Sequence, residues 1–96
     1  MIKKLTKTEV TQKLKRLSGW KMVKGRNAIT KTFKFSNFQE AFGWMTSIAI
    51  YAEKKDHHPE WFNVYSTVEV TLSTHDAGGV TSLDLDMAKE MNQKSK

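Results

Sequence analysis

The chain has 96 residues and a mass of 11.0 kDa, with 16 Lys and Arg against 10 Asp and Glu, for a formal net charge of +6. A chain of this length folds as one unit, so we expect a single domain over residues 1–96 and exclude a multi-domain enzyme. It has no cysteine, which excludes disulfides, a thiol nucleophile and a thiolate metal site, and favours a reducing, cytoplasmic compartment. No signal peptide is visible, and the longest apolar run, residues 48–52, is far below the roughly 20 residues that span a bilayer, so we expect no membrane association.

Positive charge is concentrated in the N-terminal third. Residues 1–34 hold eleven basic residues and one acid, Glu9, giving +10, whereas residues 35–96 hold five basic and nine acidic residues, giving −4. A basic surface of this kind can attract phosphates. No arginine cluster or Gly-aromatic RNA motif accompanies it, so we expect a solvated, lysine-rich surface and no nucleic-acid partner.

The first expected element is a helix over residues 7–18. Thr6 and Glu9 have the spacing of a capping box, and Gly19 supplies a stop. The apolar stripe of this helix consists of Val10, Leu14 and Leu17.

Two short strands follow, over residues 20–24 and 28–35. The loop between them, Gly25-Arg26-Asn27, has the length and chemistry of a hairpin connection. In the second run one parity is apolar and the other polar, which indicates one buried face, and only Lys31 interrupts the apolar parity. The two sets are Ile29, Phe33 and Phe35 against Thr30, Thr32 and Lys34.

A long second helix is expected next. Ser36 is the predicted N-cap with Gln39 in the reciprocal position, and the helix should end near Asp56 or His57. Its predicted apolar face consists of Phe38, Phe42, Met45, Ala49 and Ala52.

Pro59 forces the chain to turn and leave in an extended conformation. Residues 61–74 are strand-forming, with Val68, Val70 and Leu72 expected inside, but periodicity alone leaves open whether they form one strand or two joined near residues 63–66.

Gly78-Gly79 permits a sharp turn before the last helix. Thr81 with Asp84 predicts its capping box, and the apolar side of this helix is Leu85, Ala88 and Met91. Strands and helices without regular alternation predict an α+β domain, an antiparallel sheet with helices on one face.

All three histidines lie between residues 57 and 75. His57 and His58 fall where the long helix ends and His75 where a strand ends, so the three could converge on one pocket, with Glu53 and Asp56 nearby. Two other readings remain open. The histidine pair could simply fill the exposed last turn of a helix. Three imidazoles could also hold zinc, although adjacent residues at a helix end diverge by about 100° and no HxH or HxxxH spacing occurs.

The spacing of these residues forms a specific pattern. Glu53 is followed after three residues by His57-His58-Pro59, after five more by Tyr65, after nine by His75 and after eight by Asp84. This pattern resembles the signature of the pterin-4a-carbinolamine dehydratases, a family also described in animals as a dimerisation cofactor of a homeodomain transcription factor. The likeness extends to Trp20 and to residues 59–65 and 71–75, and so to nearly the whole chain.

The resemblance implies a four-stranded antiparallel sheet in the order α-β-β-α-β-β-α, with residues 61–74 supplying two strands, and a homodimer or homotetramer. It also implies dehydration of a 4a-hydroxytetrahydropterin to quinonoid dihydropterin, a step in tetrahydrobiopterin recycling, without a metal or bound cofactor. The implied pterin-binding residues are Asp56, His57, His58, Ser73, Thr74, His75 and Asp76, with Glu53 and Trp20 close to them and Pro59 and Asp84 in support.

Imidazole suits this reaction on physical grounds. Expelling the hydroxyl group needs an acid and completing the neutral product needs a base, and an imidazole with a pKa of about 6.5 can serve as either. Of the catalytic set His57, His58 and His75, we expect the first and last to transfer protons and His58 to orient the substrate. Which imidazole is acid and which is base stays open.

Two functions from other classes compete with this enzyme. One is a protein-binding module that acts as a transcription-factor cofactor, which would add a nuclear location. The other is a basic nucleic-acid binder that uses residues 1–34. A binding module would keep its activity after all three histidines were replaced by Gln, and a steep salt dependence of affinity would favour the nucleic-acid binder.

Overall fold

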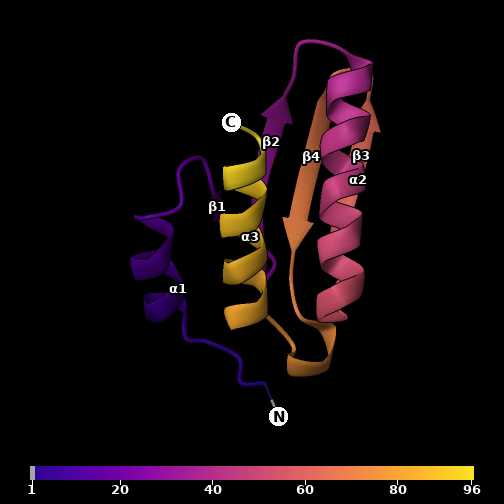
Figure 1. Cartoon of the computed structure of the whole chain (residues 1–96). Helices are drawn as coiled ribbons and strands as arrows, with labels where there is room; N and C mark the ends of the chain where they lie inside the picture. The colour runs from indigo at the N-terminus through magenta and orange to yellow at the C-terminus, as the bar shows by residue number, and fades with distance from the viewer. Residues whose placement is uncertain (1) are drawn as a thin grey trace.

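The computed structural model describes residues 2–96 and shows a four-stranded antiparallel sheet with helices on one face (Figure 1). The strands are ordered β1-β2-β4-β3, so β3 is an edge strand. The elements in chain order are α1 (Lys7–Leu14), β1 (Lys21–Met22), β2 (Ile29–Lys34), α2 (Phe38–Lys55), β3 (Glu60–Val64), β4 (Thr67–Leu72), a short 3-10 turn η1 (His75–Ala77) and α3 (Ser82–Lys94). The predicted α+β class and element order are confirmed.

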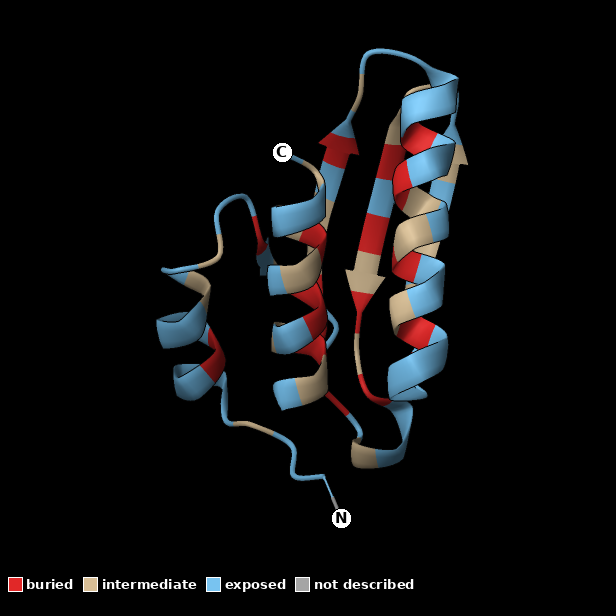
Figure 2. Cartoon of the chain, viewed as in Figure 1, coloured by how far each residue is buried: buried red, intermediate tan, exposed pale blue. Residues whose placement is uncertain are grey.

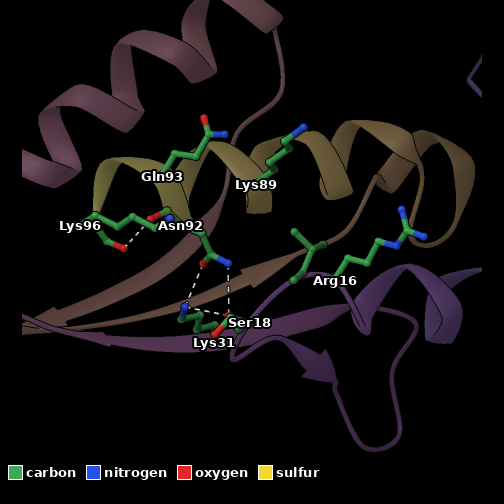
Figure 3. A pocket seen from close by; sticks show the side chains of 9 residues that line it. Arg16, Ser18, Lys31, Lys89, Asn92, Gln93 and Lys96 are labelled. Atoms are coloured by element: carbon green, nitrogen blue, oxygen red, sulfur yellow. Dashed lines mark hydrogen bonds between the residues drawn. The ribbon is translucent and has the colours of Figure 1, made fainter.

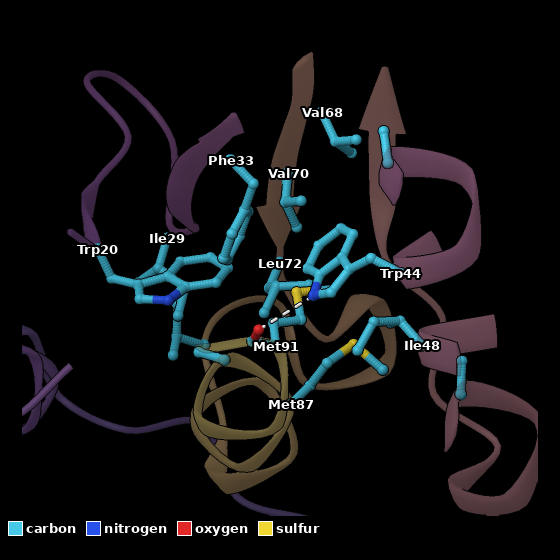
Figure 4. Packing of buried hydrophobic residues seen from close by; sticks show 14 of the residues in the cluster. Trp20, Ile29, Phe33, Trp44, Ile48, Val68, Val70, Leu72, Met87 and Met91 are labelled. Carbon is cyan, nitrogen blue, oxygen red and sulfur yellow. Dashed lines mark hydrogen bonds between the residues drawn. The ribbon is translucent and has the colours of Figure 1, made fainter. Parts of the chain in front are cut away.

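The core lies between the sheet and helices α2 and α3. Figure 2 shows the buried positions on the inward sides of these elements, and Figure 4 shows the side chains interleaving. Trp44 is tied down by a hydrogen bond from Nε1 to the Met91 carbonyl oxygen, 3.1 Å long. Each large apolar side chain buried here contributes on the order of 1.5–3 kcal/mol. Its members include Trp20, Ile29, Phe33, Trp44, Ile48, Val68, Val70, Leu72, Met87 and Met91.

Helix α1 begins as predicted but ends early. The Thr6–Glu9 capping box is present, with Glu9 N donating to Thr6 Oγ1 at 3.1 Å and Thr6 N donating to Glu9 Oε1 at 2.8 Å. These bonds to Thr6 are the main reason that the pKa of Glu9 lies below its ordinary value. Regular helix stops at Leu14, and tighter turns carry the chain to Gly19, whose φ of 84° is left-handed. The predicted end at residue 18 was therefore wrong.

Helix α2 corrects two predictions. Its N-cap is Asn37, not Ser36, because Asn37 Oδ1 accepts the hydrogen bond from Glu40 N at 2.8 Å. The predicted apolar face was only partly right, since Ala52 is buried and Met45 packs against the core, whereas Phe38 and Phe42 are 47% and 55% exposed. The helix carries two apolar stripes at helical spacing, and periodicity cannot tell which one packs on the sheet. The buried stripe is Ala41, Trp44, Ile48 and Ala52.

The stretch after Pro59 forms two strands rather than one. Strands β3 and β4 pair in an antiparallel hairpin, and Tyr65 makes the turn with a φ of 52°. The predicted inward residues of β4 are buried. The Thr81–Asp84 capping box at the start of α3 is confirmed.

Lys31, which interrupts the apolar parity of β2, is accommodated by hydrogen bonds. Its Nζ donates to the Ser18 carbonyl oxygen and to Asn92 Oδ1, both at 2.8 Å. Burial lowers the pKa of Lys31 below its ordinary value. Within residues 2–96, no helix has the length and apolar character needed to cross a membrane.

Candidate active site

A cleft of about 290 Å³ lies where α2 ends and η1 begins, at the lower end of the molecule in Figure 1. Strand β4 and helix α2 both end on this side, which brings two segments distant in sequence together. Seven of the predicted site residues line the cleft, namely Asp56, His57, His58, Ser73, Thr74, His75 and Asp76. The convergence of the three histidines on one cleft is therefore observed.

The end of α2 determines where His57 points. Asp56 adopts a left-handed conformation with a φ of 51°, and its N–H donates to the last carbonyls of the helix. The next residue, His57, donates its backbone N–H to the Ala52 carbonyl oxygen at 3.1 Å. This closure resembles a common left-handed helix ending. It turns the His57 ring back into the protein, where it is buried.

Asp84 joins three elements behind the cleft lining and is fully buried. His57 Nε2 lies 2.6 Å from Asp84 Oδ1. The other carboxylate oxygen, Oδ2, accepts hydrogen bonds from the Thr74 hydroxyl at 2.8 Å and from Thr81 N at 2.9 Å. One carboxylate thus caps α3, anchors the end of β4 and holds the ring that follows α2.

This arrangement selects a tautomer for His57. A carboxylate accepts hydrogen bonds, so Nε2 carries the proton that points at Asp84, and in the neutral ring Nδ1 keeps its lone pair. No hydrogen bond to Nδ1 is present within residues 2–96, and no buried side-chain nitrogen or oxygen there lacks a partner. Nδ1 is therefore not a fully buried atom, and His57 is among the residues that line the cleft.

The other two histidines also meet carboxylates, but at the surface. His58 Nε2 lies 2.6 Å from Glu53 Oε1, one helical turn back on α2. His75 is 81% exposed, and its Nε2 lies 3.5 Å from Glu60 Oε2. Glu60 in turn accepts a two-pronged hydrogen bond from Arg26, at 2.8 and 2.5 Å. That hydrogen bond is the main cause that holds the pKa of Glu60 below its ordinary value and the pKa of Arg26 above its own.

Four predicted residues stand apart from the cleft lining, and one of them, Pro59, lies between α2 and β3. Trp20 belongs to the core, where its Nε1 donates to Asn92 Oδ1 at 3.0 Å. Glu53 reaches the site only through His58, and Asp84 only through His57 and Thr74.

Thr74 is occupied within the protein. Besides its hydroxyl, its backbone N–H donates to the Gly79 carbonyl oxygen at 2.9 Å. It therefore shapes the turn before η1 and does not offer these groups to a ligand.

Four residues at or beside the cleft were missed by sequence reasoning. Ile2 and Leu83 line it, and their apolar side chains carry no chemical signature in the sequence. Glu60 lies beside His75 and is paired with Arg26, from which it is separated by 34 positions along the chain. The pairing of Arg26 with Glu60 depends on the fold, so no local spacing could have predicted it.

A larger hollow of about 450 Å³ lies between the end of α1, β2 and α3 (Figure 3). Its basic lining includes Arg16, Lys31 and Lys89, and no histidine or carboxylate side chain lines it. Unlike the histidine cleft, it is not lined by imidazole groups. In the part of the chain that the structure describes, no three histidine or carboxylate groups are arranged to hold a metal ion.

The fold and the cleft together define a small α+β protein in which three imidazoles line one cleft. Residues 3–94 match the family model of pterin 4 alpha carbinolamine dehydratase, and the chain belongs to this family. It is 58% identical over 92 residues to a Rhodopseudomonas palustris protein provisionally named a pterin-4-alpha-carbinolamine dehydratase, covering 96% of this chain and 91% of the relative.

Two Brucella proteins are similar to the same extent. A Brucella ovis protein with the same provisional name is 56% identical over 89 residues, covering 93% of this chain and 92% of the relative. The crystal structure of a transcriptional coactivator/pterin dehydratase from Brucella melitensis superposes with a TM-score of 0.95 at 54% identity, covering 97% of this chain and 99% of that one.

Proposed function

We propose that this chain is a dehydratase that converts a 4a-hydroxytetrahydropterin into quinonoid dihydropterin and water, and so takes part in tetrahydrobiopterin recycling. Family membership supports the substrate class. The observation that carries the mechanism is the cleft in which three imidazoles meet, one of them fixed by a buried carboxylate.

The reaction needs one proton donated and one accepted. The lone pair of the ring nitrogen beside the carbinolamine carbon forms a C=N bond as the C–O bond breaks, the departing hydroxyl takes a proton and leaves as water, and the same nitrogen loses its proton. General acid–base assistance of such steps is typically worth about 10²–10⁴-fold each. The number of protons on the protein is unchanged after one turnover.

The environments of the histidines support distinct roles. His57 presents an unprotonated Nδ1 to the cleft with its ring held by Asp84, which suits the base. His75 is exposed beside Glu60, which suits an imidazolium that delivers the proton to the hydroxyl. His58, held by Glu53, is assigned to substrate orientation, together with Asp56, Ser73 and Asp76 of the cleft wall.

An ultraviolet stopped-flow assay of 4a-hydroxytetrahydropterin decay tests this function, with a chelator present throughout. We expect the purified chain to accelerate decay, and His57→Ala or His75→Ala to lower turnover by about 10²-fold or more. Lys24→Gln, a change at an exposed residue outside the cleft, is the control. Near-normal turnover of both histidine variants would contradict the assignment.

We also propose that the chain forms a homo-oligomer through β3. This edge strand has unpaired backbone groups, and Phe62, Val64 and the turn residue Tyr65 are 63%, 57% and 64% exposed. Exposed apolar edge strands favour pairing with a second copy. Light scattering after size exclusion should give a dimer or tetramer mass for the parent chain and a smaller mass for Val64→Lys; an unchanged mass would point to another interface.

A second candidate function is docking of a protein partner, with a nuclear location if that partner is a transcription factor. The observation that favours it is the outer face of α2, where Phe38, Phe42 and Ile50 are exposed. The similar Brucella melitensis protein is described as a transcriptional coactivator. Replacing all three histidines by Gln should abolish dehydration and leave partner binding intact, whereas Phe42→Lys should do the reverse. If the chain has no nuclear partner, we propose that it acts in the cytoplasm.

A further inference from the structure

His75 sits on an exposed turn that is closed by its own backbone. Thr74 N donates to the Gly79 carbonyl oxygen at 2.9 Å, and Gly78 N returns to the Thr74 carbonyl oxygen at 3.0 Å. Gly78 completes the turn with a φ of 78°. These bonds fix the shape of the turn, but they do not fix where it stands relative to the sheet.

Asn27, in the loop between β1 and β2, fastens both ends of this turn. Its carbonyl oxygen accepts a hydrogen bond from Ser73 Oγ at 2.9 Å, just before the turn. Its side-chain Oδ1 accepts one from Val80 N at 3.0 Å, just after it. A Cβ at Gly79 would lie only 2.6 Å from Asn27 Cγ, so the two segments are packed as closely as a glycine allows.

The neighbouring residue, Arg26, reaches the histidine itself. Its guanidinium holds both oxygens of Glu60 on β3, and one of these oxygens faces His75 Nε2 at 3.5 Å. A carboxylate held by a bidentate arginine has a fixed orientation. Glu60 is thus presented to His75 by the same loop that fastens the turn on which His75 sits.

We propose that the loop Gly25-Arg26-Asn27 is the positioning element for His75: Asn27 fixes the turn, and Arg26 acts through Glu60 to orient the imidazole. For its effect on turnover this inference rests on the proposed function. None of the three residues is required to touch the substrate. A group that orients a functional imidazole acts through the geometry of the reacting atoms, and a misplacement of about 1 Å can cost up to about 10²-fold in rate.

Glu60 also affects the electrostatics of His75. Glu60 brings a negative charge to a ring that must carry a positive charge before it protonates the hydroxyl, and Arg26 offsets part of it. The other charged or titratable groups on this cleft are Asp56, His57, His58 and Asp76. Glu60 is the carboxylate found within 4 Å of the His75 ring in the described residues.

The decisive experiment is a double-mutant cycle. Glu60→Gln should lower kcat by about 10-fold with little change in KM, because it removes a group that acts through His75. The same change in a His75→Ala background should add less than about twofold, because coupled residues are not additive. Arg26→Lys, which keeps charge but loses the two-pronged bond, should fall between Arg26→Gln and the parent chain. Lys24→Gln changes the residue directly before the loop and is the matched control. It should change kcat by less than twofold.

A second measurement separates failure of this inference from failure of the proposed function. Thermal unfolding first checks that the parent chain and each variant are folded. The ring 15N resonances of His75 are then recorded for each protein without substrate. We expect them to move in Glu60→Gln and Asn27→Ala and to stay in place in Lys24→Gln. Unmoved resonances, or a full 10-fold loss from Glu60→Gln in the His75→Ala background, overturn the positioning role. Absent turnover in the parent chain overturns the proposed function alone.

Discussion

His57 and His58 are adjacent in the chain and make the same contact, yet the two contacts have different surroundings. Each places Nε2 2.6 Å from a carboxylate oxygen, of Asp84 in one case and Glu53 in the other. The first pair has side chains 9% and 0% exposed, the second 55% and 79%. Equal distances therefore do not imply equal energies, because burial decides how much of each contact water can replace.

The buried pair should be rigid and the exposed pair adjustable. Asp84 is fully buried, so water cannot take the place of His57 as its partner. The carboxylate is also held by hydrogen bonds from Thr74 and Thr81, which leaves the ring of His57 one stable orientation. In the exposed pair, water can replace either Glu53 or His58 as the hydrogen-bond partner at little cost in free energy. This difference agrees with the roles proposed above, in which His57 accepts a proton in a fixed position and His58 contacts the substrate.

The largest expected effect comes from Asp84→Ala. It removes the partner of His57, leaves the Thr74 hydroxyl and Thr81 N–H without their acceptor, and deletes a helix cap. Each buried donor left without an acceptor costs about 1–3 kcal/mol, so the total loss should reach several kcal/mol. Denaturant unfolding should report this loss, and turnover should fall with it because the tautomer of His57 is no longer set.

Glu53→Ala is the matched change at the surface. It also removes the carboxylate at 2.6 Å from a histidine, but the pair is exposed, so the free energy of unfolding should change by less than about 1 kcal/mol. Equal destabilisation by the two substitutions would erase the distinction between the two contacts.

The two contacts also differ in how far the sequence could reveal them. Thr81 and Asp84 are three residues apart, so the capping role of Asp84 could be predicted from spacing. Its contact with His57 spans 27 residues and depends on how α2 and α3 pack. The family resemblance implies that Asp84 supports the cleft, but it does not indicate the contact with His57.

Other elements show the same limit. The polar and apolar parities of β2 predicted its buried face because only one face was apolar. In α2 the predicted face combined exposed Phe38 and Phe42 with buried Ala52, because only the packing of Trp44 against the sheet shows which side of the helix is covered. Arg26 and Asn27 were read as turn residues, since a loop sequence alone does not indicate what its side chains reach.

A smaller effect is expected from His58→Ala. Because His58 is exposed and assigned to substrate orientation, its removal should raise KM by about 10-fold while kcat falls by less, and the free energy of unfolding should change by under about 0.5 kcal/mol. His57→Ala should show the opposite division, a large loss of kcat. Steady-state kinetics of both variants measure this split, and a larger kcat loss for His58→Ala would reverse the roles proposed for the two rings.

A further small effect tests the third carboxylate contact, that of Glu60 with His75 and Arg26. Arg26 lowers the pKa of Glu60 from its ordinary value of 4.5, so the pair stabilises the fold above the pKa of the unfolded chain, and that stability is lost as pH falls through the lowered pKa of the folded state. Since the Glu60 side chain is 45% exposed, the contribution should stay below about 1 kcal/mol. The difference in unfolding free energy between the parent chain and Glu60→Gln should therefore be present at pH 7 and vanish towards strongly acidic pH. A difference that does not change with pH would show that Gln disturbs packing rather than charge, and a difference as large as that from Asp84→Ala would place this contact with the buried pair.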